Sequence, residues 1–522
     1  MKRFKFDKPL VESPYPPQDT NVLWVDVDES TGKVGSIKEF KNGEWIEIVG
    51  TGGEGSSAGY DPINDVTLNA KSYGVWWKTN DIVSSADNIT QIGEGIKTLP
   101  IHNKLKRVAY NHTDNTTRYL NEIDASSEVI AENESVMVEV PEFYGRSWKY
   151  IDAEGQTINV VRVSEEQIDE TWYKIPHCYI SAWCNTGAGE TGITCKPFDG
   201  DTVTTYQTDI SLIDARVASV ATGGVTLYYD LYKWVMYWLP IIEFSTFALT
   251  REYKFNPNYD VTMEDQTTFY WTTDYLDTVK VTDLNGNVQV SASNAEVDSA
   301  YLLEGTMGFG LINSANGVVN VTPPGKTLCL GNRTGKVVIS QEGHQTVPGP
   351  VCAYSWRGFE NISGDIAQWL DGFITCPNED NGGGLYLTDT KETLSLPLST
   401  SDYTNIYLSN RFMEIPEVLT TGMALPTEFL LGNNGDMIGC NTNDQMTAMV
   451  AAFANSDLSG ISDVQTVYLR SSPRACEVGS SGLVTSNGFG AVAICGPGYL
   501  YAGGPDLGSG SSYVGFRTVL GL

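Results

Sequence analysis

The sequence predicts a mainly β protein with minor α structure. Aromatic residues make up 11% of the 522 residues, glycine occurs 52 times, and charged residues make up only 19%. Aromatic and β-branched side chains suit a pleated, half-buried sheet, and glycine suits the tight turns between strands. Several segments also alternate apolar and polar residues, which is typical of strands with one buried face. The chain is too long for one ordinary core, so we expect about three domains.

The excess of acidic residues and the pattern of apolar residues argue against two classes of partner, nucleic acids and membranes. The formal net charge is −31, and such a surface repels phosphate backbones, so we expect no nucleic-acid binding. The most apolar stretch, residues 227–244, is interrupted by charges and a proline, and its apolar residues recur at helical spacing. This pattern predicts a packed amphipathic helix and no membrane insertion. The basic start lacks an apolar core of signal-peptide length, which favours retention in a bacterial cytoplasm.

Residues 1–50 predict a small β unit. Prolines at 14, 16 and 17 keep its start extended, residues 21–28 alternate as a strand, and residues 33–48 give two more strands around an Asn-Gly turn. Trp24 and Trp45 could bury one face of this unit, but three short strands are marginal alone. We therefore expect a partner chain to complete their core. Residues 51–60, rich in glycine and serine, predict a flexible linker.

The rest of the chain divides by the strength of its strand pattern. Residues 61–134 are polar and mixed, and we interpret them as a connecting β or irregular region. Strands are clearer from residue 135 onward. Residues 255–320 predict an inserted β unit, which leaves 135–254 and 321–522 as the two parts of one domain. Within that domain, residues 362–369 predict a short helix.

The polar motifs predict neither a metal nor a cofactor. The nine cysteines include no CxxC pair, and only four histidines accompany them, so the closely spaced ligands of a zinc site are absent. Buried free thiols are the better interpretation. Asp283, Asn285 and Asn287 are spaced like the opening of a calcium loop, but its closing glutamate is missing, so a hairpin turn is the better interpretation.

Five segments together resemble the C-type-lectin-like domains of bacteriophage fibre proteins. They occur in the order and spacing of one domain over residues 135–522, without the insertion. The segments are residues 136–144 (VMVEVPEFY), 241–246 (IIEFST), 331–335 (GNRTG), 354–372 (YSWRGFENISGDIAQWLDG) and 514–517 (VGFR). The resemblance implies a C-terminal lectin-like α+β domain that carries the β insertion. Residues 1–50 resemble the N-terminal segments of head and tail fibre proteins of crAss-like phages, which commonly anchor the fibre to the particle.

We interpret the polar residues of these segments as scaffold. Arg357, Glu360 and Asn361 flank apolar residues and could satisfy buried backbone groups. Phe516 is expected to point inward, and Arg517 is expected to reach a carboxylate.

A receptor surface is expected in the glycine-rich loops between about 480 and 512. The side chains that could stack on or hydrogen-bond a sugar there are Asn487, Tyr499, Tyr501 and Asp506. The alternative is that Tyr499 and Tyr501 pack in a subunit interface.

The favoured function is therefore a non-catalytic virion protein: a homotrimeric head fibre, bound to capsid or tail proteins through Trp24 and Trp45, that attaches to a host glycan or receptor. A tail fibre is the nearest alternative. A formylglycine-generating-type enzyme shares this fold but needs a reactive cysteine pair, for which only Cys476 and Cys495 are available. A GxSxG match at residues 55–59 lies in the linker, where no nucleophile elbow forms. A bacterial surface adhesin is disfavoured by the missing signal peptide.

Overall fold

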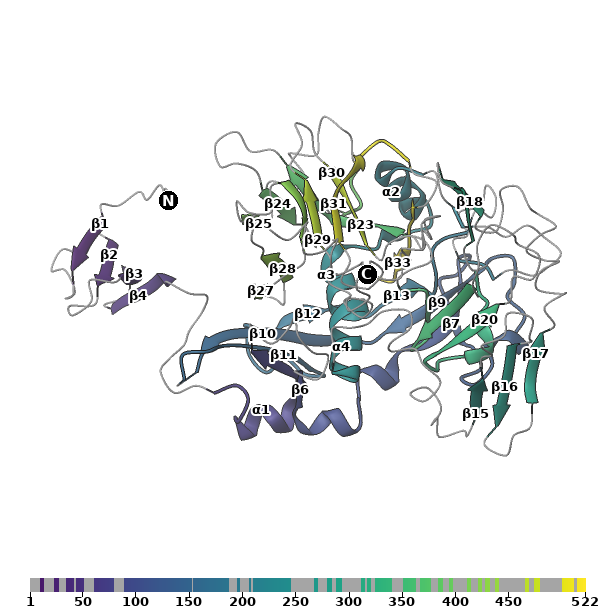
Figure 1. Cartoon of the computed structure of the whole chain (residues 1–522), viewed down its shortest axis with the longest axis horizontal. Coiled ribbons are helices and arrows are strands. Elements are labelled where there is room, and N and C mark those ends of the chain that lie inside the picture. Colours follow the sequence, from purple (N-terminus) through teal and green to yellow (C-terminus); the bar gives the residue numbers. More distant parts are fainter. Residues whose placement is uncertain are drawn as a thin grey trace.

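In the computed structural model, most of the described secondary-structure elements are strands (Figure 1). Side chains are described for residues 61–78, 89–186 (without 149, 153 and 157), 195–197, 206–207, 210–245, 324–335, 355–362, 367–372, 394–397, 507–510 and 514–522, and further strands are described by their backbone. The described elements are mainly β with a few short helices, which confirms the predicted class.

The N-terminal strands form a four-stranded sheet in the order β1-β2-β3-β4. Their bounds are Leu10–Ser13, Leu23–Val27, Val34–Lys41 and Glu44–Gly50. The parallel strand β1 lies at the edge, and the three following strands are antiparallel, with the expected turn between β3 and β4. Trp24 lies in β2 and Trp45 in β4, while their side chains are outside the described residues.

Two sheets build the central body. The first has the order β12-β10-β11-β5-β6, with bounds Tyr173–Ile175, Phe143–Ile151, Thr157–Ser164, Tyr73–Lys78 and Thr90–Ile92. The second has the order β14-β33-β13-β9-β7-β8, with bounds Val225–Thr226, Thr518–Leu520, Cys178–Ser181, Glu134–Val140, Lys106–Asn111 and Thr117–Tyr119.

Both sheets contain strands from before and from after residue 134, where the sequence suggested a domain boundary. Strand β5 pairs with β11, and β7 pairs with β9, so strands on either side of residue 134 are hydrogen-bonded neighbours. Residues 61–134 are therefore part of the body and not a separate connecting region. The hydrophobic core confirms this, because Trp77 and Ile101 are buried in the same cluster as Val138 and Val519.

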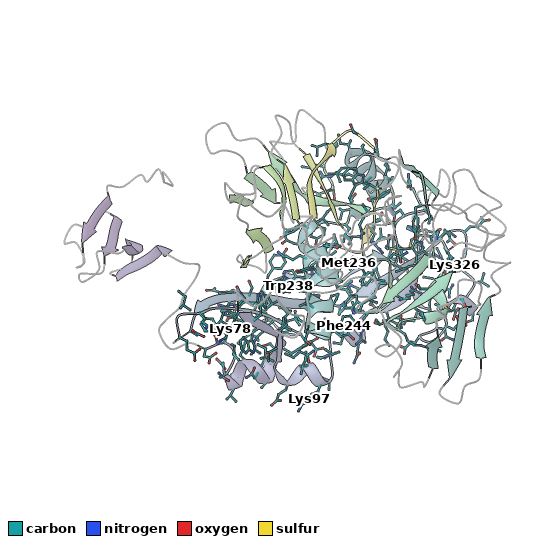
Figure 2. The ribbon with its side chains drawn as sticks, in the orientation of Figure 1. Lys78, Lys97, Met236, Trp238, Phe244 and Lys326 are labelled. Atoms are coloured by element: carbon teal, nitrogen blue, oxygen red, sulfur yellow. The ribbon has the colours of Figure 1, made fainter. Side chains whose placement is uncertain are left out.

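A buried helical segment covers these sheets. It consists of α3 (Tyr229–Tyr232), the π-helical turn η6 (Lys233–Trp238) and α4 (Leu239–Phe244). The predicted helix is confirmed, but its amphipathic character is wrong, since every residue from 229 to 242 is buried. Asp230 and Lys233 lie within the buried segment and pair with each other at 2.6 Å. In Figure 2 the labelled Met236, Trp238 and Phe244 lie in the interior of the body, among the described side chains.

The helical segment fits the sheet because glycine leaves room for an indole ring. A Cβ atom at Gly145 would lie 2.4 Å from the Trp234 ring, which is closer than real side chains approach. Trp238 stacks on Trp77 of β5, with ring centroids 5.7 Å apart. The π-helical turn ends just before Pro240, which has no amide hydrogen to donate to the preceding turn. These contacts fix the helical segment against β10 and β5 of the first sheet.

The C-terminal half adds further sheets. A three-stranded sheet contains β20 (Gly335–Ile339), β21 (Val351–Trp356) and β22 (Phe359–Glu360). A larger sheet has the order β25-β24-β23-β30-β31-β29-β26, with bounds Arg411–Glu414, Gly384–Leu387, Ala367–Cys376, Arg474–Val478, Leu500–Asp506, Gln465–Tyr468 and Thr421–Ala424. The short strand β32 (Val514–Gly515) also pairs with β23. The short helix predicted over 362–369 is wrong at its end, because residues 367–369 belong to β23 and pair with β30 and β32. Neighbours distant in sequence thus override the local helical pattern.

The region expected as an insertion contains its own paired strands. Strands β15 (Thr267–Tyr270), β16 (Val279–Asp283) and β17 (Val288–Ala292) form one antiparallel sheet, and β18 (Leu311–Ser314) pairs with β19 (Gly317–Asn320). Asp283 ends β16, and β17 begins five residues later as its antiparallel partner. This pairing agrees with the interpretation as a hairpin, and residues 284–287 of its turn lie outside the described residues.

A buried ion pair connects helix α2 (Leu212–Ala221) to strand β23 of the larger C-terminal sheet. Arg216 lies in α2, and its guanidinium donates to both carboxylate oxygens of Asp371 in β23, at 2.8 and 2.6 Å. The two side chains are 1% and 0% exposed. Removal of one partner of such a pair leaves a buried charge without compensation.

We therefore expect Asp371→Ala to lower the free energy of unfolding by about 3–5 kcal/mol, measured by urea denaturation. The control is Glu165→Ala, which removes the partner of Lys104 in a pair whose side chains are 45% and 58% exposed. That change should cost less than about 1 kcal/mol because water and salt screen the pair. Equal effects of the two substitutions would contradict the role assigned to Asp371.

Candidate functional site

Two of the expected receptor residues lie in a strand and not in a loop. Tyr501 and Asp506 belong to β31 (Leu500–Asp506), which pairs with β30 (Arg474–Val478) on one side and with β29 (Gln465–Tyr468) on the other. The expectation of a loop is therefore wrong for residues 500–506, where two neighbouring strands satisfy the backbone. Asn487, Tyr499 and the side chains of β31 lie outside the described residues.

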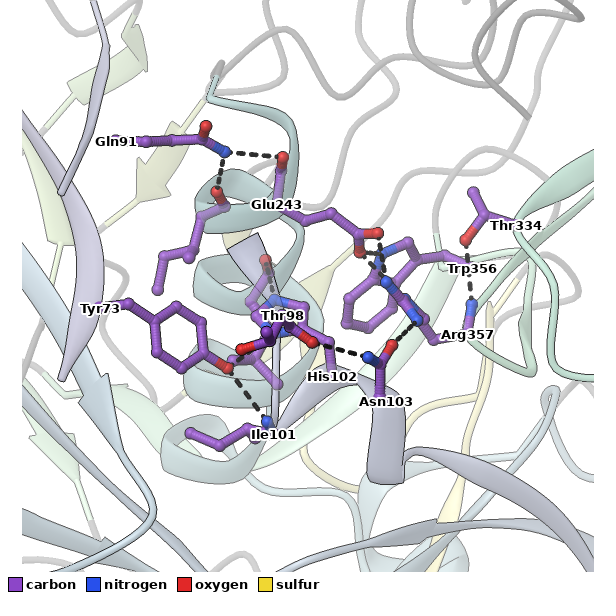
Figure 3. A network of polar contacts seen from close by, with 12 residues as sticks. Tyr73, Gln91, Thr98, Ile101, His102, Asn103, Glu243, Thr334, Trp356 and Arg357 are labelled. Carbon is purple, nitrogen blue, oxygen red and sulfur yellow. Dashed lines mark hydrogen bonds and ion pairs between the residues drawn. The ribbon is translucent and has the colours of Figure 1, made fainter. Parts of the chain in front are cut away.

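A network of described polar side chains lies where α4 meets β5, β6 and the turn after β21 (Figure 3). One part is a chain of hydrogen bonds through His102, which is fully buried. The Ile101 backbone N–H donates to the Tyr73 hydroxyl at 3.2 Å, and this hydroxyl lies 3.0 Å from His102 Nδ1. His102 Nε2 lies 2.8 Å from the Leu239 carbonyl oxygen. A carbonyl can only accept, so Nε2 carries the hydrogen and Tyr73 donates to Nδ1.

Burial keeps both members of this chain neutral. Loss of hydration lowers the pKa of His102 to about 4, with Glu243 opposing this shift and Arg357 adding to it. Burial likewise raises the pKa of Tyr73 well above its usual value. The imidazole is therefore a neutral link between the sheet and the helix, and not a general base near pH 7.

Glu243, at the end of α4, forms the charged part of the network. Arg357 donates to it at 2.6 and 3.2 Å, and the Trp356 indole N–H donates to it at 2.8 Å. Arg357 also donates to the Asn103 side-chain oxygen at 2.7 Å. Burial opposes the charge of Glu243, but Arg357 and these hydrogen bonds outweigh it and lower its pKa.

The C-terminus of α4 is completed by Gln91 of β6. Its amide nitrogen donates to the carbonyl oxygens of Ile242 and Glu243, at 2.9 and 3.0 Å. These are carbonyls that the last helical turn leaves without a partner. Ser245 follows in the left-handed conformation, with φ of 50°.

Two further non-glycine residues beside the network have a positive φ. They are Leu99 at 45° and Arg357 at 51°. Such conformations cost on the order of 1–3 kcal/mol each and persist only where surrounding contacts hold them. The network therefore offsets local strain and fixes the segments that it connects.

A second polar junction centres on Arg517, which is fully buried. It donates to the backbone carbonyls of Ser181, Glu360 and Asn361 at 3.0, 2.7 and 3.0 Å, and to the side-chain oxygen of Gln368 at 2.7 Å. The expectation that Arg517 binds a carboxylate is wrong, because carbonyl oxygens surround it. Phe516 is fully buried, as expected.

Of the three residues expected to satisfy buried backbone groups, Glu360 does so through its side chain. A carboxylate oxygen of Glu360 accepts from the Gly325 backbone N–H at 2.7 Å, so the prediction that Glu360 satisfies a buried backbone group is confirmed. Asn361 contributes its carbonyl oxygen to Arg517. Arg357 differs from the expectation, because its guanidinium binds side chains of the Figure 3 network.

The described cysteines are free thiols. Cys178, Cys184 and Cys195 are buried and Cys329 is half-buried, which confirms the interpretation for these four. Burial raises the pKa of Cys329 to about 12 and those of Cys178 and Cys195 further, so these three are not thiolates at neutral pH. The side chains of Cys476 and Cys495 lie outside the described residues. Within the described part of the chain, no group of three or more His, Cys, Asp and Glu residues is arranged to hold a metal ion.

Protonation of His102 should destabilise the native state. The unfolded chain takes up this proton near pH 6.5, whereas the folded chain takes it up near pH 4. As the pH falls between these values, the free energy of unfolding should therefore decrease, by up to about 3 kcal/mol for this group. Urea denaturation of wild type and His102→Gln at several pH values should show that the variant loses this part of the dependence. Tyr73→Phe is the control, since it removes the two hydrogen bonds of the hydroxyl and keeps the imidazole. Parallel profiles for wild type and His102→Gln would contradict the assignment.

Comparisons with known proteins give no evidence on function, so that evidence comes from the residues of this chain. No family model matches the chain, and no curated protein matches it. Among the described residues, no helix is long and apolar enough to cross a membrane. The functional interpretation therefore depends on the contacts just described and on the sequence segments that they connect.

Proposed function

We propose that this chain is a structural subunit of a bacteriophage virion, a homotrimeric fibre whose body is a C-type-lectin-like domain. The observation that carries the proposal is that the five segments with a lectin-like sequence contact common neighbours or one another. They span residues 136 to 517, so their meeting is not a consequence of closeness along the chain.

The strand contacts support one domain. Residues 136–144 include most of β9, and residues 514–517 lead directly into β33; both strands pair with β13, one on each side. Figure 1 marks the C-terminus within the body, beside β33. The first lectin-like segment and the strand that directly follows the last one thus belong to one sheet. Val514 and Gly515 of the last segment pair with Ala367 and Gln368 of the fourth.

The polar junctions support the same view. Glu243, from the second segment, binds Trp356 and Arg357 of the fourth. Arg517, from the last segment, binds the carbonyls of Glu360 and Asn361 in the fourth. The Asn332 side chain, from the third, accepts a hydrogen bond from the Arg107 backbone beside β9.

The N-terminal sheet is the proposed virion anchor. Strands β1–β4 precede a glycine-rich linker, and Trp24 and Trp45 lie in β2 and β4, the two strands that flank β3. Four short strands gain stability when a partner covers one face. In this proposal the partner is a capsid or tail protein, the head being favoured because the sequence has no heptad stalk.

Catalysis is the competing proposal. A formylglycine-generating-type enzyme would require Cys476 and Cys495 as reactive thiols. Ser substitution of both should leave particle assembly and attachment intact if the chain is structural. Loss of a measurable turnover in that variant would favour the enzyme.

Deletion of residues 1–50 should abolish incorporation into particles and leave a folded body, because residues 51–60 separate the two parts. Incorporation is measured by immunoblot of purified particles, and folding by circular dichroism of the purified chain. The control is Glu165→Ala, which should enter particles as wild type does. Wild-type incorporation of the truncated chain would overturn the anchor assignment.

The double substitution Tyr499→Ala with Tyr501→Ala tests the receptor surface. If these rings contact a glycan, binding to host cells should fall by about tenfold or more, since each stacked ring contributes on the order of 1 kcal/mol. The oligomeric mass is measured in parallel by light scattering. Unchanged binding, or a broken oligomer, would place the two tyrosines outside the receptor site.

A further inference from the structure

One face of the six-stranded sheet places a carboxylate between two tyrosines. Glu139 in β9 pairs directly with Tyr179 of β13 on one side and with Lys106 of β7 on the other, and directly paired residues of antiparallel strands project from the same face. Tyr119 of β8 is 63% exposed, and its hydroxyl donates to a carboxylate oxygen of Glu139 at 2.7 Å. We call Tyr119, Glu139, His177 and Tyr179 the tyrosine face.

The Tyr179 ring of this face is held in place by its neighbours. The His177 ring packs edge-on against it, with ring centroids 5.2 Å apart, and the Tyr110 ring lies 5.5 Å from it. Gly521, with φ of 79°, leaves room for the ring, because a Cβ atom there would lie only 3.0 Å from it. A surface whose side chains are already ordered loses little entropy when a partner binds.

Glu139 is oriented and still has the capacity to bind a ligand. Its second carboxylate oxygen lies 2.9 Å from His177 Nε2, so each oxygen has one of these contacts. An ionised carboxylate offers about four acceptor positions, so further donors can be accommodated. The side chain is 19% exposed, which leaves it accessible while water and salt screen it less than a fully exposed group.

A cation of this chain already lies over the exposed tyrosine. The Lys106 ammonium is 5.9 Å from the centre of the Tyr119 ring, and it also pairs with Glu122. The face of an aromatic ring attracts a cation within about 6 Å. The tyrosine ring and the carboxylates around it therefore favour cationic groups.

The same combination holds an arginine on the first sheet. The Arg146 guanidinium lies 4.5 Å from the centre of the Trp148 ring and pairs with Asp169 at 3.1 Å. In that site a ring and a carboxylate bind one guanidinium together. The tyrosine face offers a ring and a carboxylate in the same way, but its ring is largely exposed.

Long-range charge favours the same kind of partner. The chain carries a net charge of −31, so its surface attracts basic segments and repels acidic ones. Among basic groups, the planar guanidinium stacks on aromatic rings and donates to a carboxylate in a fixed fork geometry. An arginine therefore fits the tyrosine face better than a lysine does.

We propose that the tyrosine face binds a basic segment of a partner protein, with an arginine guanidinium stacked on the Tyr119 ring and hydrogen-bonded to Glu139. The proposal goes beyond the fibre function, because it adds a protein contact on the body to the contact proposed for the N-terminal sheet. It does not depend on whether the assembly belongs to a virion.

The test is the binding of a fluorescein-labelled arginine–glycine repeat peptide to the full-length chain, measured by fluorescence anisotropy at about 0.15 M salt. The wild-type chain should bind it with a Kd below about 1 mM. Glu139→Gln should weaken binding at least about tenfold, because it removes the charge that meets the guanidinium. The charge-matched control is Glu165→Gln, at a side chain 45% exposed, which should weaken binding less than about twofold.

Two variants of Tyr119 separate the ring from its hydroxyl. Tyr119→Leu should weaken binding about threefold to fivefold, the range of one exposed contact between a cation and a ring. Tyr119→Phe keeps the ring and should bind as wild type does. Near-ultraviolet circular dichroism monitors folding, and if Glu139→Gln alters the spectrum, the two Tyr119 variants decide the outcome.

A peptide with citrulline in place of arginine keeps the shape and loses the charge, and it should not bind. Equal weakening by Glu139→Gln and Glu165→Gln would overturn the proposal, since binding would then follow overall charge alone. Equal binding of the citrulline peptide, equal effects of the two Tyr119 variants, or a wild-type chain that does not bind would also overturn it. None of these results bears on the virion function, which is tested separately by the deletion of residues 1–50.

Discussion

The body of this protein depends on buried guanidinium groups that satisfy backbone carbonyls far apart in sequence. Among the described residues, five arginines are almost fully buried: Arg107, Arg162, Arg216, Arg333 and Arg517. Arg107 binds carbonyls of Thr327 and Gly358, Arg162 that of Pro62, and Arg333 that of Ile123. A buried carbonyl without a partner costs about 1–3 kcal/mol, so a fold with many irregular connections needs such donors. Each arginine joins segments that lie far apart along the chain.

These contacts explain how the chain closes on itself. The C-terminal segment contributes β33 to the second sheet and Arg517 to the turn after β22, so the end of the chain holds segments near residues 181 and 361. The Figure 3 network performs the same task for α4, through Glu243 and neutral His102. In both junctions the polar side chains are hydrogen-bonded to other groups of the body. Such closed networks suit a rigid structural body, which is the property that the proposed fibre requires.

The sequence predicted elements better than it predicted their pairing. The strand at β9, the helix near 229–244, the hairpin at β16 and β17 and the inward side chain of Phe516 all follow from local periodicity, turn residues or motif order. The pairing of β5 with β11 and of β7 with β9 does not, because strand partners are chosen by contacts between segments that are distant along the chain. The same reason explains why residues 367–369 and 500–506 were misjudged, since each joins a strand only through distant neighbours. The pairing of Glu243 with Arg357 was also missed, although both lie in segments that the lectin-like resemblance had identified.

The role of Arg517 is tested most directly by amide hydrogen exchange in Arg517→Met. Three amides report on its junction: Asn185, which donates to the Phe516 carbonyl; Leu227, which donates to the Arg517 carbonyl; and Glu360, which donates to the Ala182 carbonyl. If the guanidinium holds the closing segment, all three should exchange at least about 100-fold faster, corresponding to roughly 3 kcal/mol of lost protection. The Asn111 amide, bonded to Thr116 in a local hairpin, should be unaffected. Unchanged exchange at Asn185, Leu227 and Glu360 would contradict the account.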